Sequence, residues 1–87
     1  MFVHIGENVG VKSNEIIGIF DLENATVRES SRGFLVDAEK KSRVTYTSDK
    51  MPRSFVVTSS KDGVRVFLTQ LSAKAIYERA NKSEQEY

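Results

Sequence analysis

Residues 44–68, VTYTSDKMPRSFVVTSSKDGVRVFL, alternate between runs of β-branched and aromatic residues and short polar turns. This composition is typical of strands, which we predict at residues 43–47, 54–59 and 64–68. The second turn contains Asp62-Gly63, a dipeptide that favours a tight hairpin. We therefore expect three consecutive strands, joined by two hairpins, in a largely antiparallel sheet.

The first of these two turns is basic. It carries Lys50, Arg53 and the only proline of the chain, Pro52. Proline stiffens a turn and cannot donate a backbone hydrogen bond, so it also discourages strand pairing at an edge. Two interpretations stay open for the cations: they keep an exposed turn hydrated, or they contact a negatively charged partner.

The first twenty residues carry a second group of short strands. Phe2–Ile5 and Val9–Val11 are β-type runs separated by a polar turn. The stretch Glu15–Phe20, EIIGIF, is nearly continuous apolar sequence, which is typical of a buried central strand. Gly18 within it favours a bulge or the close approach of a neighbouring backbone. We expect these three strands to form a compact β-meander.

Two segments have helical spacing. The first runs from Thr26 to Lys41 and begins with a capping box between Thr26 and Glu29. The second, Ala73–Ala80, follows Ser72, a residue type that caps helices. The predicted fold is therefore α+β: a small, mostly antiparallel sheet of about five or six short strands, one mid-chain helix and one C-terminal helix.

The length of 87 residues predicts one domain, at the small end of what folds alone. We place this domain at residues 1–80 and predict a polar, disordered tail at 81–87. A core of this size supplies only a few kcal/mol of net stability, about 3–5 kcal/mol at most, so self-association is a natural supplement.

Composition argues against several classes of function. The chain has no cysteine, which removes disulfides, thiolate metal sites and thiol nucleophiles. His4 is the only histidine, so no Ser/His/Asp set assembles around it, and no stretch resembles a calcium loop. The N-terminus lacks the pattern of a signal peptide, and no apolar run is long enough to span a bilayer. We expect a cytoplasmic protein without enzymatic activity, metal, cofactor, small-molecule substrate or membrane.

Charge is unevenly distributed along a chain whose net charge is +1. Residues 1–25 hold one cation against four carboxylates, whereas residues 26–61 hold eight cations against four carboxylates. A localised positive surface in the middle of the chain is where phosphate binding would lie. The same residues also suit an ordinary solvated surface, so the charge pattern alone leaves both interpretations open.

Two stretches resemble a known family. HIGENVGVKSNEIIGIFDLE at 4–23 and MPRSFVVT at 51–58 are similar, in order and spacing, to segments of the bacterial extracellular matrix regulatory proteins RemA and RemB. The opening is closer to the RemB type, in which an Ile-Gly segment precedes an I-x-G-I-F-D strand. The resemblance covers residues 1–80 and is weakest over 24–43.

This resemblance implies a small α+β subunit that assembles into closed homo-oligomeric rings. For the RemA type it also implies binding of double-stranded DNA and transcriptional activation of biofilm matrix genes. The family's DNA-binding loop is arginine-rich, and the matching positions here are Lys50 and Arg53. Lys12 and Arg43 would widen the surface if they project to the same side.

Two departures weaken the likeness to the DNA-binding type. Asp49, Lys50 and Met51 stand where RemA-like sequences have consecutive arginines, and Glu15 replaces an arginine before the apolar strand. A carboxylate that faces phosphate is repulsive. The alternative prediction is an oligomeric scaffold or protein-interaction module that does not bind DNA. A third is an RNA-binding β-module with Tyr46 as a stacking surface.

Overall fold

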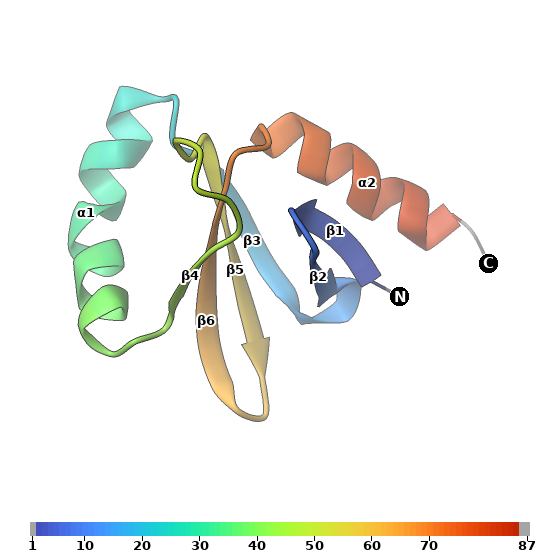
Figure 1. Cartoon of the computed structure of the whole chain (residues 1–87), viewed down its shortest axis with the longest axis horizontal. Coiled ribbons are helices and arrows are strands. Elements are labelled where there is room, and N and C mark those ends of the chain that lie inside the picture. The colour runs from blue at the N-terminus through green and yellow to red at the C-terminus, as the bar shows by residue number, and fades with distance from the viewer. Residues whose placement is uncertain (1, 86–87) are drawn as a thin grey trace.

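The computed structural model describes residues 2–85, with side chains described for residues 2–24 and 32–82. Over these residues the chain forms six strands and two α-helices, which confirms the predicted α+β class. The strands are β1 (Phe2–Gly6), β2 (Val9–Lys12), β3 (Ile16–Asp21), β4 (Val44–Tyr46), β5 (Ser54–Ser60) and β6 (Gly63–Thr69), and the helices are α1 (Ala25–Lys40) and α2 (Ala73–Gln85). Three layers result: α1, a four-stranded sheet, and the β1–β2 pair with α2 (Figure 1).

The β5–β6 hairpin is the centre of the four-stranded sheet, whose strand order is β3-β5-β6-β4. The two strands pair antiparallel from Ser54 opposite Thr69 to Ser60 opposite Gly63. Gly63 has φ +108°, a backbone conformation that glycine adopts without a steric penalty. The hairpin predicted from Asp62-Gly63 is confirmed.

The other predicted hairpin, between residues 43–47 and 54–59, is wrong. β4 runs parallel to β6 and lies on its far side from β5. β5 is already paired on one edge with β3 and on the other with β6, and both partners are longer than the three residues of β4. Neither edge of β5 is left for β4, so β4 pairs with the outer edge of β6, and the segment at residues 47–53 crosses the end of β6 to reach β5.

The predicted β-meander of the first three strands is also wrong. β1 and β2 form their own two-stranded sheet, and β3 pairs with β5 instead of β2. The run at 16–20 is thus an outer strand, although its sequence predicts a central one. The irregularity expected at Gly18 is confirmed, because the pairing of β3 with β5 shifts between Ile16 and Gly18.

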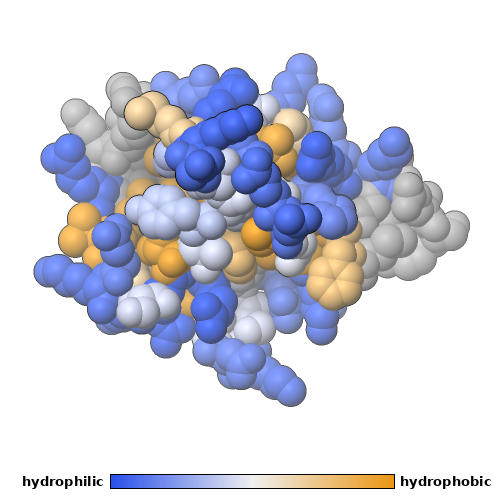
Figure 2. Space-filling view, viewed as in Figure 1, coloured by the Kyte–Doolittle hydropathy of each residue, from blue (hydrophilic) through white to orange (hydrophobic). Residues whose placement is uncertain are grey.

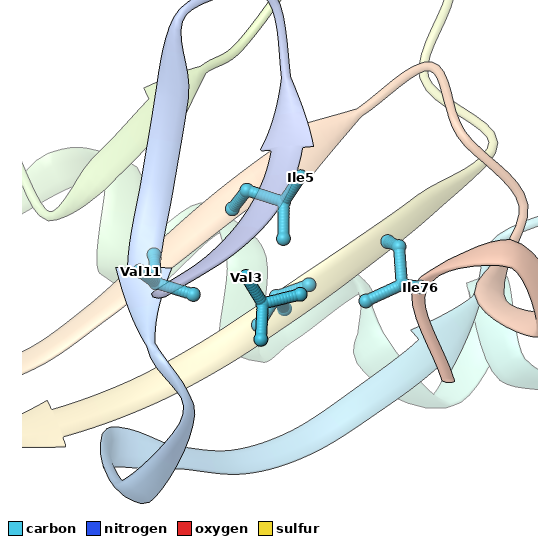
Figure 3. Close-up of a cluster of buried hydrophobic side chains, with 5 residues drawn as sticks. Val3, Ile5, Val11 and Ile76 are labelled. Atoms are coloured by element: carbon cyan, nitrogen blue, oxygen red, sulfur yellow. The ribbon is translucent and has the colours of Figure 1, made fainter. Parts of the chain in front are cut away.

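The face of the sheet toward β1, β2 and α2 is closed by an apolar cluster. Its buried members are Val3, Ile5, Val11, Val56 and Ile76. Figure 3 shows the side chains of β1 and α2 gathered over β5. Full burial of one such side chain stabilises a protein by about 1.5–3 kcal/mol. Because the β1–β2 pair shares no ladder with the larger sheet, this cluster is its main attachment.

A second cluster lies on the other face, beneath α1. It consists of Ala38 from the helix with Phe55, Val57 and Val66 from the sheet. Alternate residues of β5 therefore face opposite cores, which explains its three consecutive buried apolar residues, Phe55, Val56 and Val57. α1 begins at Ala25, and the capping box predicted for Thr26 and Glu29 lies outside the described side chains.

α2 begins where the sequence predicts. The hydroxyl of Ser72 accepts a hydrogen bond from the backbone N–H of Ala75, 3.1 Å away, which confirms the predicted cap. The helix ends at Gln85 and not at the predicted Ala80.

Candidate nucleic-acid interface

Residues 47–53, called here the crossover loop, carry the two candidate cations, Lys50 and Arg53, at one end of the sheet. The loop is anchored to β6 at both ends: Thr47 N–H donates to the carbonyl of Leu68 (2.9 Å) and Arg53 N–H donates to that of Thr69 (2.8 Å). In Figure 1 it is the yellow-green segment that passes in front of the strands. Between its anchors the loop stands away from the core, since Met51 is 86% exposed.

Lys50 is the freest cation of the crossover loop. Its side chain is exposed and forms no ion pair with any side chain among those described. The backbone beneath it is shaped by a turn in which Lys50 N–H donates to the hydroxyl of Ser48 (3.1 Å). Asp49 precedes it in the sequence, so the positive electrostatic potential around Lys50 is weaker than it would be beside a second cation.

Arg53 is partly neutralised. Its Nε donates to Oε1 of Glu23 at 2.9 Å, and both side chains are about half exposed, at 53% and 51%. The backbone carbonyl of Arg53 accepts a hydrogen bond from Leu22 N–H at 2.9 Å, so the same residue holds the turn before α1. An exposed ion pair of this kind contributes only about 0–1 kcal/mol. The guanidinium keeps four further N–H donors, which suit a phosphate group.

Arg43 lies toward the opposite end of the sheet. Its carbonyl bonds to Val66, whereas Arg53 bonds to Thr69, three residues further along β6 and roughly 10 Å away at about 3.3 Å per residue. The guanidinium of Arg43 donates through Nη1 to the carbonyl of Val64 (2.9 Å). There it lines an open groove of about 490 Å³ beside α1, with Lys41 on the same rim.

Lys12 is also far from the crossover loop. It ends β2, opposite Phe2, and the chain then enters β3 at Ile16, which lies opposite Thr58 near the β5–β6 turn. The structure thus places Lys50 and Arg53 on the same loop, and Lys12 and Arg43 toward the other end of the sheet. Glu15, which departs from the family pattern, sits with Lys12 before β3, so within one subunit it does not face the crossover loop.

The Glu23–Arg53 pair is the feature of this surface that sequence reasoning missed. Asp21 lies opposite Ser54 in the β3–β5 ladder, so the residues just beyond this row, Glu23 and Arg53, are neighbours. Knowledge of the strand pairing would have found the contact, whereas sequence distance hides it.

The described part of the chain has neither a metal site nor a membrane-spanning helix. No group of three or more histidine or carboxylate side chains there is placed to hold a metal ion. Within those same residues, neither helix has the length and apolar character needed to cross a membrane.

Comparison with known proteins gives one match. The model of the RemA-like family, described as extracellular matrix regulatory protein A-like, matches residues 2–80. No curated protein matches the chain. The closer likeness to the RemB type stays a prediction.

Proposed function

The chain belongs to the RemA-like family of extracellular matrix regulatory proteins, and we propose that it is a ring-forming, DNA-binding regulator of bacterial extracellular matrix (biofilm) genes. In this role it acts in the cytoplasm by binding and not by catalysis. The observation that carries the proposal is the family match, which includes the exposed crossover loop with Lys50 beside Arg53. These two residues are the proposed phosphate contacts.

Assembly makes two cations per subunit sufficient. One subunit offers two cations: Lys50, and Arg53, whose charge is partly neutralised by Glu23. Two such contacts are too few for measurable duplex binding. A ring repeats the same loop around one surface, and each phosphate neutralised adds to affinity by releasing counterions. Contacts linked in one assembly also gain from effective concentration. The proposed complex is therefore strongly salt-dependent.

A titration of labelled duplex DNA tests this proposal. Fluorescence anisotropy is measured from low to physiological salt, with the assembly of the protein checked by light scattering. We expect binding that weakens steeply with salt, and its loss when Lys50→Glu and Arg53→Glu are combined. Lys61→Glu combined with Arg65→Glu is the matched control, because both are exposed cations in the β5–β6 hairpin and the change of charge is the same; it should retain binding.

The second candidate is an oligomeric scaffold or protein-interaction module of the same family. The Glu23–Arg53 pair favours it, because this contact together with Asp49 leaves the crossover loop nearly neutral. It predicts no duplex affinity from assembled protein even at low salt, a result that would contradict the DNA-binding proposal. A single-stranded RNA probe titrated in parallel tests the RNA-binding alternative.

A further inference from the structure

β3 is an apolar strand with an unprotected edge. Within residues 2–85 it is paired on one side only, with β5. Residues 16–20, IIGIF, contain no charged residue and no proline, the residue types that protect free edges in natural proteins. Ile17 is 64% exposed and Phe20 41% exposed. The pairing irregularity ends at Gly18, and from there to Asp21 the strand is regular. Such an edge is a template for pairing with another chain.

The opposite edge of the same sheet belongs to β4, which is paired only with β6. Its last residue, Tyr46, is 58% exposed. β4 runs parallel to β6, and β3 runs parallel to β6 as well because two antiparallel steps separate them. The two free edges therefore point in the same direction. A second copy, rotated about an axis along the strands, would place its β4 beside β3 as a parallel pair.

The rows of the sheet put matching side chains at these two edges. One row reads Phe20, Phe55, Leu68, Tyr46, from the β3 edge to the β4 edge. Residues of one row share a face of the sheet, so Phe20 and Tyr46 both lie on the α1 face. The ring of Phe20 is already stacked on Phe55, with centroids 4.9 Å apart. If a second copy continues the row, its Tyr46 meets the exposed side of Phe20, an aromatic pair of the kind that stabilises sheets.

Charges flank the two edges with opposite signs. Glu15 precedes β3 and Asp21 ends it, whereas Arg43 precedes β4 and Lys50 follows it. In a parallel pair Arg43 and Glu15 would lie at the same end of the contact, and the Arg43 guanidinium would have to leave the Val64 carbonyl to reach the carboxylate. Lys50 takes no part in this contact, because its loop turns away across the end of β6. Complementary charges set register and partner choice more than raw affinity.

We propose that the free edge of β3 pairs in parallel with the free edge of β4 from a second copy of this chain. Every subunit carries both pairing strands, β3 and β4, at opposite edges of one sheet. The partner is therefore a second copy of the chain and not an unrelated peptide. Such a head-to-tail contact generates a ring when the rotation closes. The proposal rests on the assembly that the proposed function includes, and it names the residues that form the subunit contact.

Two edge variants that complement each other test the proposal. Ile17→Lys places a charge on the β3 edge, and Tyr46→Asp places one on the β4 edge; both positions are solvent-exposed, so the fold should survive. Size-exclusion chromatography with light scattering should find each variant alone at about the mass of one chain, 9.8 kDa. Mixed in equal amounts, they should form a dimer of about twice that mass, because one intact edge remains on each.

The outcomes separate this proposal from the proposed function. Tyr77→Asp is the matched control, since Tyr77 is similarly exposed but lies on α2, and it should assemble like the wild type. Single variants that stay assembled, or a mixture that stays monomeric although circular dichroism shows both variants folded, would overturn the edge assignment. Duplex binding by wild-type protein would still support the regulator in that case. A wild type that is monomeric at all concentrations would overturn both.

Discussion

The two faces of the central sheet are covered to different degrees. The face beneath β1, β2 and α2 is closed by side chains such as Ile5 and Ile76, both completely buried. Among the described side chains of α1, Ala38 and Leu35 pack on the other face, whereas Phe34 and Val36 are about half exposed. Figure 2, viewed as in Figure 1, shows hydrophilic atoms interspersed with separate apolar areas on the near side of the molecule. Over the side chains that the structure describes, the face beneath β1, β2 and α2 is thus the more completely buried.

Polar contacts follow the same division. On the face beneath β1, β2 and α2, the hydroxyl of Thr69 donates to the carbonyl of Ile5, and Nη1 of Arg79 donates to the carbonyl of His4 (3.1 Å). These bonds tie β1 to the sheet and to α2. On the other side, the turn before α1 is tied through Arg53, whose side-chain ion pair is exposed. We therefore expect substitutions on the β1–β2–α2 side to cost more stability than substitutions of the described side chains of α1.

The largest expected effect is that of Ile76→Ala. It removes a fully buried side chain and should lower the free energy of unfolding by about 2–5 kcal/mol, measured by urea denaturation and circular dichroism. Phe34→Ala on α1 is the matched comparison and should cost clearly less, because its side chain is 46% exposed. Equal losses from the two variants would break the contrast between the faces. Ile76→Val, at about 0.5–1.5 kcal/mol, keeps the test readable if the alanine variant does not fold.

The second effect concerns the polar tie of β1. Thr69→Val keeps the shape of the side chain but removes the donor to the buried carbonyl of Ile5. The Ile5 carbonyl then keeps only the longer hydrogen bond from the Thr47 hydroxyl (3.5 Å), and Leu71 N–H loses the Thr69 hydroxyl as its acceptor (3.1 Å). The expected loss is about 1–3 kcal/mol, the usual cost of removing a buried hydrogen-bond partner. Thr45→Val is the control on the same sheet, since Thr45 is less buried and should change stability little. Amide hydrogen exchange should show faster opening of β1 and β2 in the Thr69 variant; unchanged exchange would contradict the assigned tie.

Sequence patterns predicted the local parts of this fold and failed on the pairing of distant strands. Asp62-Gly63 and Ser72 identify a turn and a helix cap, because each acts within a few residues of itself. The choice between β4 and β3 as the partner of β5 depends on how much apolar surface each pairing buries, which no short pattern records. Lys50 was placed correctly in an exposed loop, whereas the Glu23 partner of Arg53 depends on that pairing.

The apolar run of β3 shows how a pattern can be informative where its simplest interpretation is wrong. IIGIF predicts a strand with neighbours on both sides, and within one chain it has a neighbour on one side only. The run is explained if the missing neighbour comes from another copy. If the proposed contact forms, the continuous apolar sequence of β3 matches its burial in the assembly, and the exposure of Ile17 and Phe20 in the single chain is the part that the second copy would cover.

The smallest expected change in stability is that of Glu23→Gln, because an exposed ion pair contributes about 0–1 kcal/mol. Its effect on DNA should be larger. Removing the carboxylate frees the Arg53 guanidinium for phosphate and takes away a negative charge that DNA would otherwise meet, worth about 1 kcal/mol at contact distance in water. Duplex affinity at low salt should therefore rise by roughly fivefold or more by anisotropy. Glu78→Gln on α2 carries the same charge change at an exposed site and is the control. An equal gain in both variants would mean that net charge alone is responsible, and no gain in Glu23→Gln would remove Arg53 from the proposed contact.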